Sequence, residues 1–319
     1  MSANFRSCKL IVDYLNYLTV IKGRSKHTID EYRIDLLMLF SFIQKIRNEK
    51  SLIEEIKDFS FVNVEYIKSI SLSDMYCFIS YCQTDRKCSA PTRSRKIVSI
   101  RQFWKYLKTK VRLIDNNITE ELETPKMPKR IPKYLNLEQS VRLLIQTENS
   151  IRNHCIITIF LNCALRLSEL VGINVIQIEG DILTVVGKGD KERKIFLTPA
   201  SKNAISNWLQ VRLSYNPVCD ALFITKFGTR ISNRAVQDMI KKNIKAADLD
   251  ATKISTHKLR HTAATLMYKY GRVDIRSLQQ ILGHESIATT EIYCHIDESQ
   301  LQSAVNSNPL ASMFGRQFL

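Results

Sequence analysis

Three closely spaced prolines, Pro125, Pro128 and Pro132, constrain the fold of this 319-residue chain more than any other feature. Proline fixes the backbone angle φ and lacks an N–H group, so a long helix cannot pass through this stretch and an extended linker is favoured. Before the prolines the hydrophobic residues follow a helical period, and after them a short alternating stretch interrupts that period. The sequence therefore predicts a mainly α fold with a small antiparallel β-sheet. Its parts are a helical domain at residues 1–114, a linker at 115–134 and an α+β domain at 135–319.

The first domain is expected to contain four helices. Apolar spacing and capping residues predict them over residues 7–21, from Ser25 onward, from Ser73 or Asp74 to Tyr81, and from about residue 92 to 108. The charged stretch between residues 44 and 64 shows little period and is expected to be a loop.

The net charge of +16 indicates a polyanionic partner, with nucleic acid favoured over an anionic membrane. The longest apolar stretch, Cys155 to Leu165, is too short to span a bilayer and contains Asn162. The N-terminus alternates apolar and charged residues, unlike a secretory signal, so a cytoplasmic location is expected. The eight cysteines form no Cys-x-x-Cys pair and are expected to be reduced thiols.

Basic residues gather in two places that precede the second domain. One face of the fourth helix carries Arg95, Arg101, Lys105 and Lys108, and the linker carries Lys129 and Arg130. A solvated basic face fits this pattern as well as contact with a DNA backbone, and the net charge favours DNA. A basic strap between two DNA-binding domains would let them close around a duplex as a clamp.

The second domain is expected to place a small sheet among helices. Asn136 caps a helix, and a buried helix ends near Arg166. Alternating residues predict three antiparallel strands over residues 175–180, 181–187 and 193–199. The last two strands flank a turn that presents Lys188, and helices resume at Lys202 and continue almost to the end.

Cationic residues in this domain suit chemistry at a phosphodiester. The charge that develops there must be neutralised by metal ions or by fixed cationic donors. The sequence shows no carboxylate cluster for metals, so no metal and no other cofactor are expected. An arginine fork pairs with two phosphate oxygens, and a tyrosine could attack the phosphorus. The candidates are Arg166, Lys188, His257, Arg260, His284 and Tyr293.

His257 falls in the first turn of a helix that Ser255 or Thr256 caps, and Arg260 follows it. Three residues apart, they share a face at the helix end that favours an anion. The next residue, His261, is expected to be a hydrogen-bonded core histidine.

Each remaining candidate has an ordinary alternative explanation. Taken alone, Arg166 is better explained as a surface arginine paired with Glu169, and Lys188 as a solubilising lysine in a turn.

Tyr293 has two rivals, Tyr268 and Tyr270. Its place after His284, which follows a helix stop at Gly283, favours it as the nucleophile.

The ordered set of candidates, with the segments "GKGDKER", "HKLRHTAATLM", "LQQILGHESIATTEIY" and "GRSKHTIDEYRIDL", resembles the tyrosine recombinases, or phage integrase family, and within it the Xer-type subgroup. The resemblance covers nearly the whole chain and implies a SAM-like core-binding domain before the catalytic domain. It also implies that Tyr293 forms a 3′-phosphotyrosyl link, that Arg166 and Arg260 clamp the phosphate, and that His257 and His284 assist. Lys188 would be the general acid, and Glu169 a supporting acid.

The resemblance further implies a site-specific recombinase that needs neither metal nor ATP. Four protomers would exchange strands between two DNA sites through a Holliday junction, with each C-terminal tail docked on a neighbour. A paralogous recombinase or an accessory activator is a further possible partner, and the location would be the bacterial cytosol at the nucleoid. The role would be chromosome dimer resolution or integration and excision of a mobile element.

Two other functions are alternatives to this one. A type IB topoisomerase uses similar tyrosine chemistry, and an architectural DNA-binding protein would explain the charge alone. The family motifs disfavour the first, and the placement of the candidate residues disfavours the second. Arg230 and Arg234 are candidates for DNA contacts near a later helix, whereas the target sequence cannot be predicted.

Overall fold

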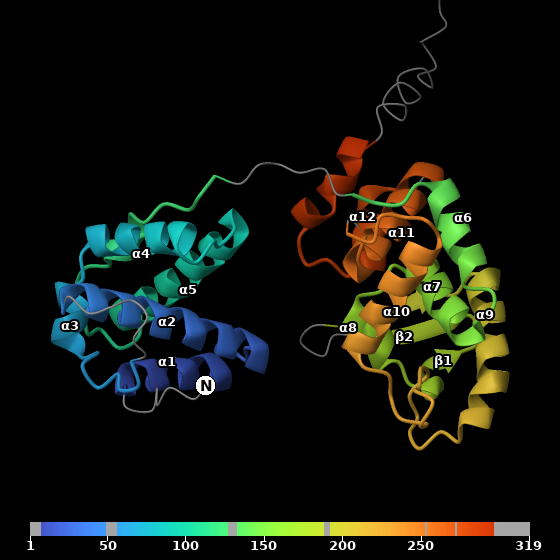
Figure 1. Cartoon of the computed structure of the whole chain (residues 1–319), viewed down its shortest axis with the longest axis horizontal. Helices are drawn as coiled ribbons and strands as arrows, with labels where there is room; N and C mark the ends of the chain where they lie inside the picture. The colour runs from blue at the N-terminus through green and yellow to red at the C-terminus, as the bar shows by residue number, and fades with distance from the viewer. Residues whose placement is uncertain are drawn as a thin grey trace, which may run out of the picture. The chain divides into compact units, whose positions relative to one another are not determined.

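The computed structural model describes residues 8–48, 56–126, 133–187, 192–252, 254–271 and 273–296. The chain divides into two compact units, Met1–Lys129 and Arg130–Leu319, and each is described by itself (Figure 1). The expected loop between residues 44 and 64 lies partly outside the described residues. Among the described residues, no helix is both long and apolar enough to cross a membrane.

The first unit is helical throughout its described part. Its elements are α1 (Lys9–Val20), α2 (Lys26–Arg47), α3 (Val64–Ser69), α4 (Leu72–Thr84), α5 (Ala90–Thr109) and the 3₁₀ turn η2 (Ile118–Glu120). Four of the helices begin at a residue whose side chain accepts a backbone N–H bond, namely Ser25, Asn63, Ser71 and Ser89. These caps satisfy N–H groups that the first helical turn leaves unpaired.

Two features of the first unit differ from the expectation. The third predicted helix begins earlier, because Ser71 and Asp74 form a reciprocal capping box that starts α4 at Leu72. The short helix α3 was not predicted, since six residues show too little of a helical period to be recognised.

The core of the first unit is built on aromatic rings. Phe40 of α2 lies against Phe103 and Trp104 of α5, with ring centroids about 6 Å apart, and all three side chains are fully buried. The packed core also continues past residue 114, because Thr119 and Leu122 are 0 % exposed. The first part of the expected linker therefore packs on the first unit.

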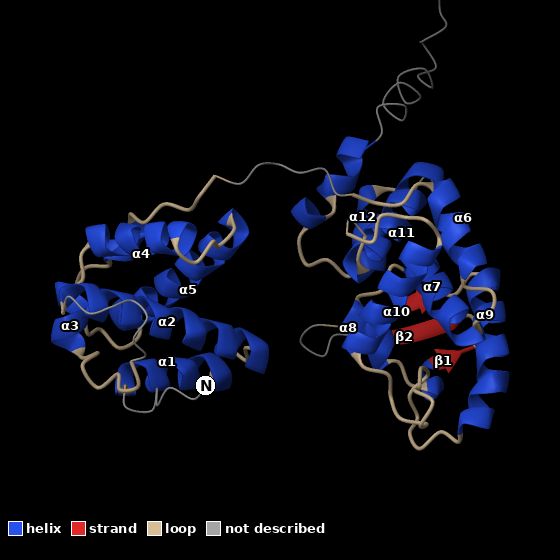
Figure 2. Ribbon diagram, viewed as in Figure 1, coloured by secondary structure: helices blue, strands red, loops and turns tan. Residues whose placement is uncertain are grey.

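The second unit combines helices with one small sheet (Figure 2). Its elements are α6 (Leu137–Gln146), α7 (Ile151–Cys163), α8 (Leu167–Gly172), η3 (Val175–Gln177), β1 (Ile178–Glu179), β2 (Ile182–Val186), β3 (Glu192–Phe196), α9 (Pro199–Arg212), η4 (Leu213–Tyr215), α10 (Asn233–Ala246), α11 (Thr256–Gly271), α12 (Ile275–Leu282), η5 (Ile287–Thr289) and η6 (Glu291–Ile296). Helix α7 is almost wholly buried and packs against α6, α9 and α11, so it is the centre of this unit.

The sheet has the strand order β1-β2-β3, and both pairs are antiparallel as expected. Leu183 pairs with Ile195, and their buried side chains alternate with more exposed neighbours, which fixes the register. The first predicted strand is mostly wrong, because a 3₁₀ turn occupies Val175–Gln177 and leaves two residues for β1.

The helices after the sheet do not continue without interruption, contrary to the expectation. Between η4 and α10 the chain forms an irregular loop closed by an isolated bridge between Ile224 and Arg230. Gly228 lies in this loop at φ +74°, where a Cβ atom would stand 2.3 Å from the carbonyl oxygen of Asn216. The close approach of two backbones therefore requires glycine here.

Two left-handed residues direct the chain at the ends of helices. Helix α7 ends at Ala164 with φ 50°, and α12 ends at Gly283 with φ 61°. Both ends turn the chain sharply. Arg166 comes two residues after Ala164, and His284 comes directly after Gly283.

Candidate active site

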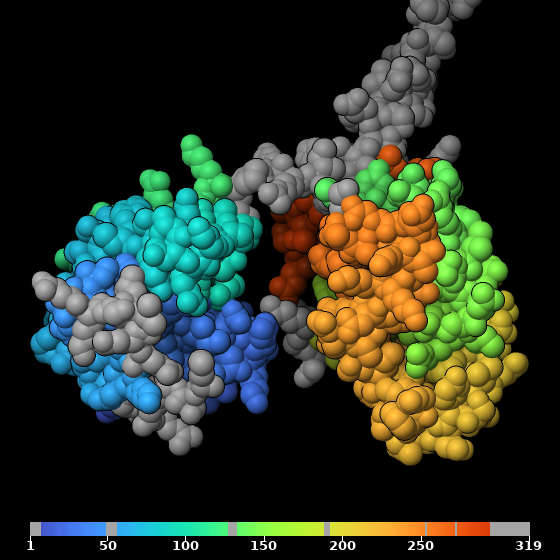
Figure 3. Space-filling view, in the orientation of Figure 1, coloured from blue at the N-terminus to red at the C-terminus, as the bar shows by residue number. Residues whose placement is uncertain are grey.

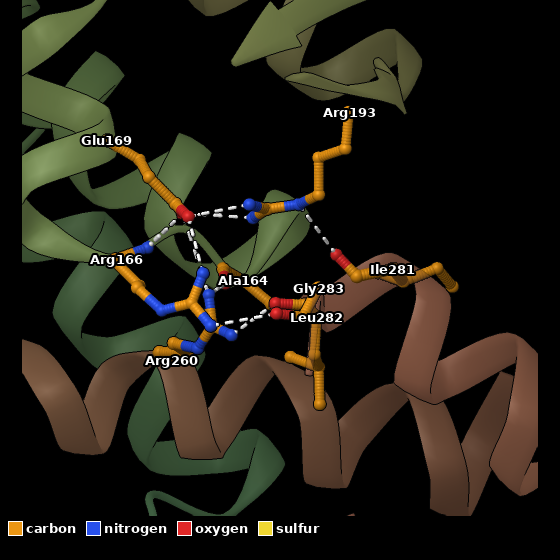
Figure 4. A network of polar contacts seen from close by, with 8 residues as sticks. All are labelled: Ala164, Arg166, Glu169, Arg193, Arg260, Ile281, Leu282 and Gly283. Atoms are coloured by element: carbon orange, nitrogen blue, oxygen red, sulfur yellow. Dashed lines mark hydrogen bonds and ion pairs between the residues drawn. The ribbon is translucent and has the colours of Figure 1, made fainter. Parts of the chain in front are cut away.

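Glu169 is the centre of a network of charged groups inside the second unit (Figure 4). Its side chain is 5 % exposed and accepts the backbone N–H of Arg166 at 2.7 Å, so it caps the start of α8. The guanidinium group of Arg166 also donates to Glu169 Oε1 at 2.7 Å. The expected pairing of Arg166 with Glu169 is therefore present, between a buried carboxylate and an arginine side chain that is 36 % exposed.

Arg193 binds the same carboxylate from the strand β3. Its two terminal nitrogens donate to Glu169 Oε1 and Oε2 at 2.6 and 2.9 Å, a bidentate geometry. Burial alone would raise the pKa of Glu169, but the hydrogen bonds from Arg193 and Arg166 outweigh it and lower the pKa to about 2. Glu169 is therefore an anion, and it binds the cationic side chains of Arg166 and Arg193.

Arg260 is the most deeply placed cation of the network, with 2 % exposure. It donates from Nη1 to the carbonyl oxygen of Ala164 at 2.7 Å, and Nη1 lies 3.6 Å from Glu169 Oε2. Burial and the neighbouring Arg166 lower the pKa of Arg260 to about 10, so it stays charged at neutral pH. Arg260 therefore brings a fixed positive charge beside Arg166.

Three arginines converge on the C-terminal end of α12. Arg193 donates to the carbonyl oxygen of Ile281 at 3.2 Å, Arg260 to that of Leu282 at 2.5 Å and Arg166 to that of Gly283 at 2.9 Å. Carbonyls in the last turn of a helix have no partner within the helix, and the helix dipole makes this end negative. The helix end therefore holds the three guanidinium groups in one place (Figure 4).

A cleft of about 540 Å³ opens beside this network. Its lining includes Arg166, Arg193, His284 and Thr289. Gly187 also lines the cleft, and it is the residue directly before Lys188. An anion in this cleft would meet the cationic side chains of Arg166, at the start of α8, and Arg193 of β3.

The two candidate histidines are neutral at physiological pH. Partial burial, with Arg260 and Arg166 nearby, lowers the pKa of His257, which stands at the exposed start of α11. Burial and the same two arginines lower the pKa of His284 to about 4. His284 Nδ1 lies 3.0 Å from the hydroxyl of Thr290, which fixes the orientation of the ring. Both rings are therefore available as neutral donors or acceptors.

Tyr293 lies in η6 with its side chain 1 % exposed. Its ring belongs to a small apolar cluster that also contains Ala164 of the α7 end and Leu282 of α12. Those two residues supply the carbonyl oxygens that accept from Arg260, so the tyrosine and this arginine share their surroundings. Burial raises the pKa of Tyr293 to about 12, although Arg260 acts in the opposite direction.

His261 contacts the Tyr293 hydroxyl, with 2.7 Å between Nδ1 and Oη. The sequence predicted a hydrogen-bonded histidine here but placed it in the core, away from the chemistry. His261 is only partly buried, and its partner is the candidate nucleophile. Arg193 was not among the predicted site residues, although it lies five residues after Lys188 in the sequence. No local pattern distinguishes it from other lysines and arginines of that segment.

The structure gathers five of the predicted catalytic residues, together with Glu169, in the second unit. Lys188 lies outside the described residues, as do Lys129 and Arg130. Of the two tyrosines considered as rivals, Tyr270 is 65 % exposed at the end of α11, whereas Tyr268 packs against the cluster that contains Tyr293.

The basic residues predicted to bind DNA differ in how free their side chains are. On α5, Arg95 makes a bidentate pair with Asp35 at 2.6 and 2.9 Å, and Arg101 donates to the carbonyl oxygens of Thr119 and Leu122. Both guanidinium groups therefore have structural partners inside the first unit. Lys105 is exposed, and Lys108 lies 3.4 Å from Glu120.

Arg230 and Arg234 show the same contrast. Arg230 donates to the backbone of Val171 and Ile173 and to the side chain of Asn174, so it ties the loop before α10 to the end of α8. Arg234 is 82 % exposed and reaches only Asp238, one turn along α10. Helix α10, orange in Figure 3, lies at the surface of its unit, so Arg234 is the better placed of the two for a contact with DNA.

Comparison with known proteins shows the family of this chain. Residues 133–300 match the Phage integrase family, and residues 11–60 match the Phage integrase N-terminal SAM-like domain. A protein of Caldanaerobacter subterraneus subsp. tengcongensis named tyrosine recombinase XerC is 47 % identical over 95 % of this chain and 87 % of its own length. Tyrosine recombinase XerD of Proteus mirabilis is 30 % identical over 92 % of this chain and 90 % of its own length.

Solved structures show the same fold. The crystal structure of XerA recombinase has 25 % identity and a TM-score of 0.51, and it covers 93 % of this chain and 97 % of its own. The Tn1549 transposon integrase has 18 % identity and a TM-score of 0.71, and it covers 94 % of this chain and 98 % of its own. The chain therefore belongs to the phage integrase family and is a site-specific tyrosine recombinase of the Xer type.

Proposed function

We propose that this recombinase cuts and rejoins duplex DNA through a covalent bond between Tyr293 and a 3′-phosphate. The observation that carries the proposal is the convergence of Arg166 and Arg260 at the end of α12, whose last residues pack against Tyr293. A phosphate bound by these arginines would lie within reach of a phenol that leaves its packed position. Fixed cations of this kind neutralise the charge that develops on the phosphate oxygens.

The reaction exchanges one ester for another. The Tyr293 oxygen bonds to phosphorus, while the bond from phosphorus to the 5′-oxygen of the next nucleotide breaks. The phenol gives up its proton, which the neutral rings of His257 and His284 are suited to handle, and the 5′-oxygen gains one. The ester bond retains the free energy of the broken linkage, so rejoining needs no ATP and no metal.

Arg166 and Arg260 divide the binding of the phosphate. The side chain of Arg166 is 36 % exposed and lines the cleft, so its remaining N–H donors point where an anion can enter. Arg260 is buried and already donates to Ala164 and Leu282, so it supplies charge and a fixed position. Glu169 holds both in register and is the supporting acid of the site.

Lys188 is the proposed general acid for the leaving 5′-oxygen. It follows Gly187, which lines the cleft, and the described strand β3 resumes at Glu192 on the same cleft wall. A lysine between these two points has the reach to enter the cleft with its four-carbon side chain.

Duplex DNA is the proposed partner. The net charge of +16 favours a polyanion, and related folds have been solved as XerH bound to its difH substrate and as a lambda integrase tetramer bound to a Holliday junction. By analogy the two units close on DNA as a clamp, with exposed cations such as Lys105 and Arg234 against the backbone. Four protomers assemble on two sites, and the tail after residue 296 docks on a neighbour.

The cellular role proposed is recombination in the bacterial cytosol, at the nucleoid. Footprinting on DNA that flanks the gene, and on the chromosome terminus, separates a mobile-element integrase from a resolvase of chromosome dimers. The same experiment with and without a paralogous recombinase or an accessory protein reveals whether either is needed. A type IB topoisomerase would relax supercoils without any defined site, whereas the relatives matched over nine-tenths of this chain are named Xer recombinases.

A nicked suicide substrate tests the chemistry. The wild-type chain is expected to trap a covalent protein–DNA adduct, and Tyr293→Phe to bind the same DNA with unchanged affinity and form none. Tyr270→Phe is the matched control, because this tyrosine is 65 % exposed at the end of α11. An adduct of full yield from Tyr293→Phe would remove Tyr293 as the nucleophile.

A further inference from the structure

The hydrogen bond between His261 and Tyr293 has no part in the mechanism above. His261 follows Arg260 on α11 and lies 32 residues before Tyr293, yet its Nδ1 atom is 2.7 Å from the phenol oxygen. The two rings lie at 49°, with centroids 5.6 Å apart. The contact therefore joins the helix that carries the catalytic arginine to the segment that carries the nucleophile.

The Tyr293 side chain is enclosed on its other sides by apolar groups. Ala263 and Ala264 of α11 and Leu278 and Leu282 of α12 belong to the same cluster, and each of them is fully buried. Tyr293 itself is 1 % exposed. The phosphate of a duplex lies at the protein surface, so the phenol oxygen cannot reach phosphorus from this position.

The proton in this hydrogen bond belongs to the tyrosine. Burial raises the pKa of Tyr293 to about 12, so the phenol is protonated at neutral pH. Burial, with His257, Arg260 and Lys258 nearby, lowers the pKa of His261 to about 4, so its ring is neutral. Tyr293 Oη–H therefore donates to Nδ1, and the ring proton of His261 is on Nε2.

We propose that His261 is a positioning residue that holds the Tyr293 hydroxyl in a retracted place, and that attack on DNA requires this hydrogen bond to break. The inference rests on the proposed role of Tyr293 as nucleophile. It adds a second function to α11, because Arg260 is proposed to bind the phosphate and the next residue, His261, binds the phenol. DNA binding then has to release the tyrosine before cleavage.

The hydrogen bond itself is tested without any reaction. The full chain is labelled at its six histidines, and the ring of His261 is titrated by NMR in the wild type and in Tyr293→Phe. The phenylalanine ring keeps the packing and removes the donor. Because a donor to Nδ1 favours the neutral ring, the pKa of His261 is expected to rise in Tyr293→Phe. An identical titration in the two proteins overturns the hydrogen bond, whichever tyrosine is the nucleophile.

The hold is tested by the rate of adduct formation on the suicide substrate. His261→Ala is expected to react roughly twofold to tenfold faster than the wild type, the factor that one neutral hydrogen bond represents. His261→Asn offers an amide oxygen as acceptor and is expected to react at nearly the wild-type rate. His27→Ala, an exposed histidine of α2, controls for the loss of an imidazole.

The outcomes separate this inference from the proposed function. Thermal unfolding first shows whether His261→Ala is folded. If the folded variant forms the adduct no faster than the wild type, His261 does not restrain the Tyr293 hydroxyl. If His261→Ala does not fold, the rate of His261→Asn and the NMR titration of His261 decide the question. Adduct formation by Tyr293→Phe instead contradicts the assignment of the nucleophile and leaves the titration result standing.

Discussion

Arg193 and Glu169 are joined by two parallel hydrogen bonds, 2.6 and 2.9 Å long, across 24 residues of chain. The pair connects β3, which begins at Glu192, to the carboxylate that holds Arg166 and Arg260. Arg193 also donates to the end of α12. One side chain therefore ties β3 to Arg166 and Arg260, the arginines proposed to bind the phosphate.

Arg193→Ala is expected to lower the free energy of unfolding of the second unit by about 2–3 kcal/mol, because it leaves part of a buried carboxylate unpaired. Adduct formation on a suicide substrate should slow by roughly 100-fold, since the arginines lose their register. Arg193→Lys keeps the charge but not the bidentate geometry, so its rate of adduct formation should lie between those of the wild type and Arg193→Ala. Lys194→Ala, the exposed neighbour on β3, is the control. Wild-type rates in Arg193→Ala would show that the clamp is dispensable.

Gly283→Ala is expected to cost about 1–2 kcal/mol of unfolding free energy, because its φ of +61° is a left-handed conformation that a Cβ atom disfavours. The added Cβ would also stand 3.1 Å from the Arg193 side chain, so the rate of cleavage should fall as well. Gly172→Ala is the matched control, since a Cβ there meets nothing within 4 Å. Thermal denaturation of both variants measures the difference, and an equal loss in the two would contradict this account.

The low pKa of Glu169 predicts a specific acid sensitivity. The pKa is lowered in the folded protein from its ordinary value of 4.5 to about 2, so the anion contributes stability that is present above pH 4.5 and is lost as the pH falls towards 2. The contribution is about 3 kcal/mol. Urea denaturation at pH 7 and at pH 3 measures the free energy of unfolding. The difference between the two pH values should be smaller for Glu169→Gln than for the wild type. Glu138→Gln, which alters an exposed pair with Arg142, should leave the wild-type dependence unchanged.

Lys188→Ala should slow cleavage of an ordinary substrate by roughly 100-fold or more, because the leaving 5′-oxygen then lacks its proton donor. A substrate with a 5′-thiol leaving group should restore the rate, since a thiolate leaves without a proton. Rates of adduct formation for both substrates measure the effect. A variant that stays slow with the thiol substrate would argue that Lys188 binds the DNA and does not act as an acid.

Local chemistry explains what the sequence predicted well. Ser25 and Asn136 accept N–H bonds at the starts of their helices, and Gly283 ends α12 in a left-handed conformation. Each of these depends on a few adjacent residues. The division into a helical part and an α+β part follows from the spacing of the hydrophobic residues along the chain. This spacing is likewise a property of short segments.

Long-range contacts explain what the sequence did not predict. Arg95 pairs with Asp35, 60 residues away, so a cation that seemed free for DNA is engaged within its own unit. Arg193 finds its acceptors 24 and 88 residues away, and His261 meets Tyr293 only because η6 packs against α11. The sequence around these residues does not indicate such partners, because the fold brings them together from distant parts of the chain.

The end of α12 also limits how far this enzyme can be thermostabilised. Its last carbonyl oxygens already accept from the arginines that a DNA phosphate would need. Substitutions that tighten those contacts would raise the melting temperature while making the arginines less available to the substrate. Selection for heat resistance alone is therefore expected to yield sluggish variants, and productive gains should come from surfaces remote from this helix end.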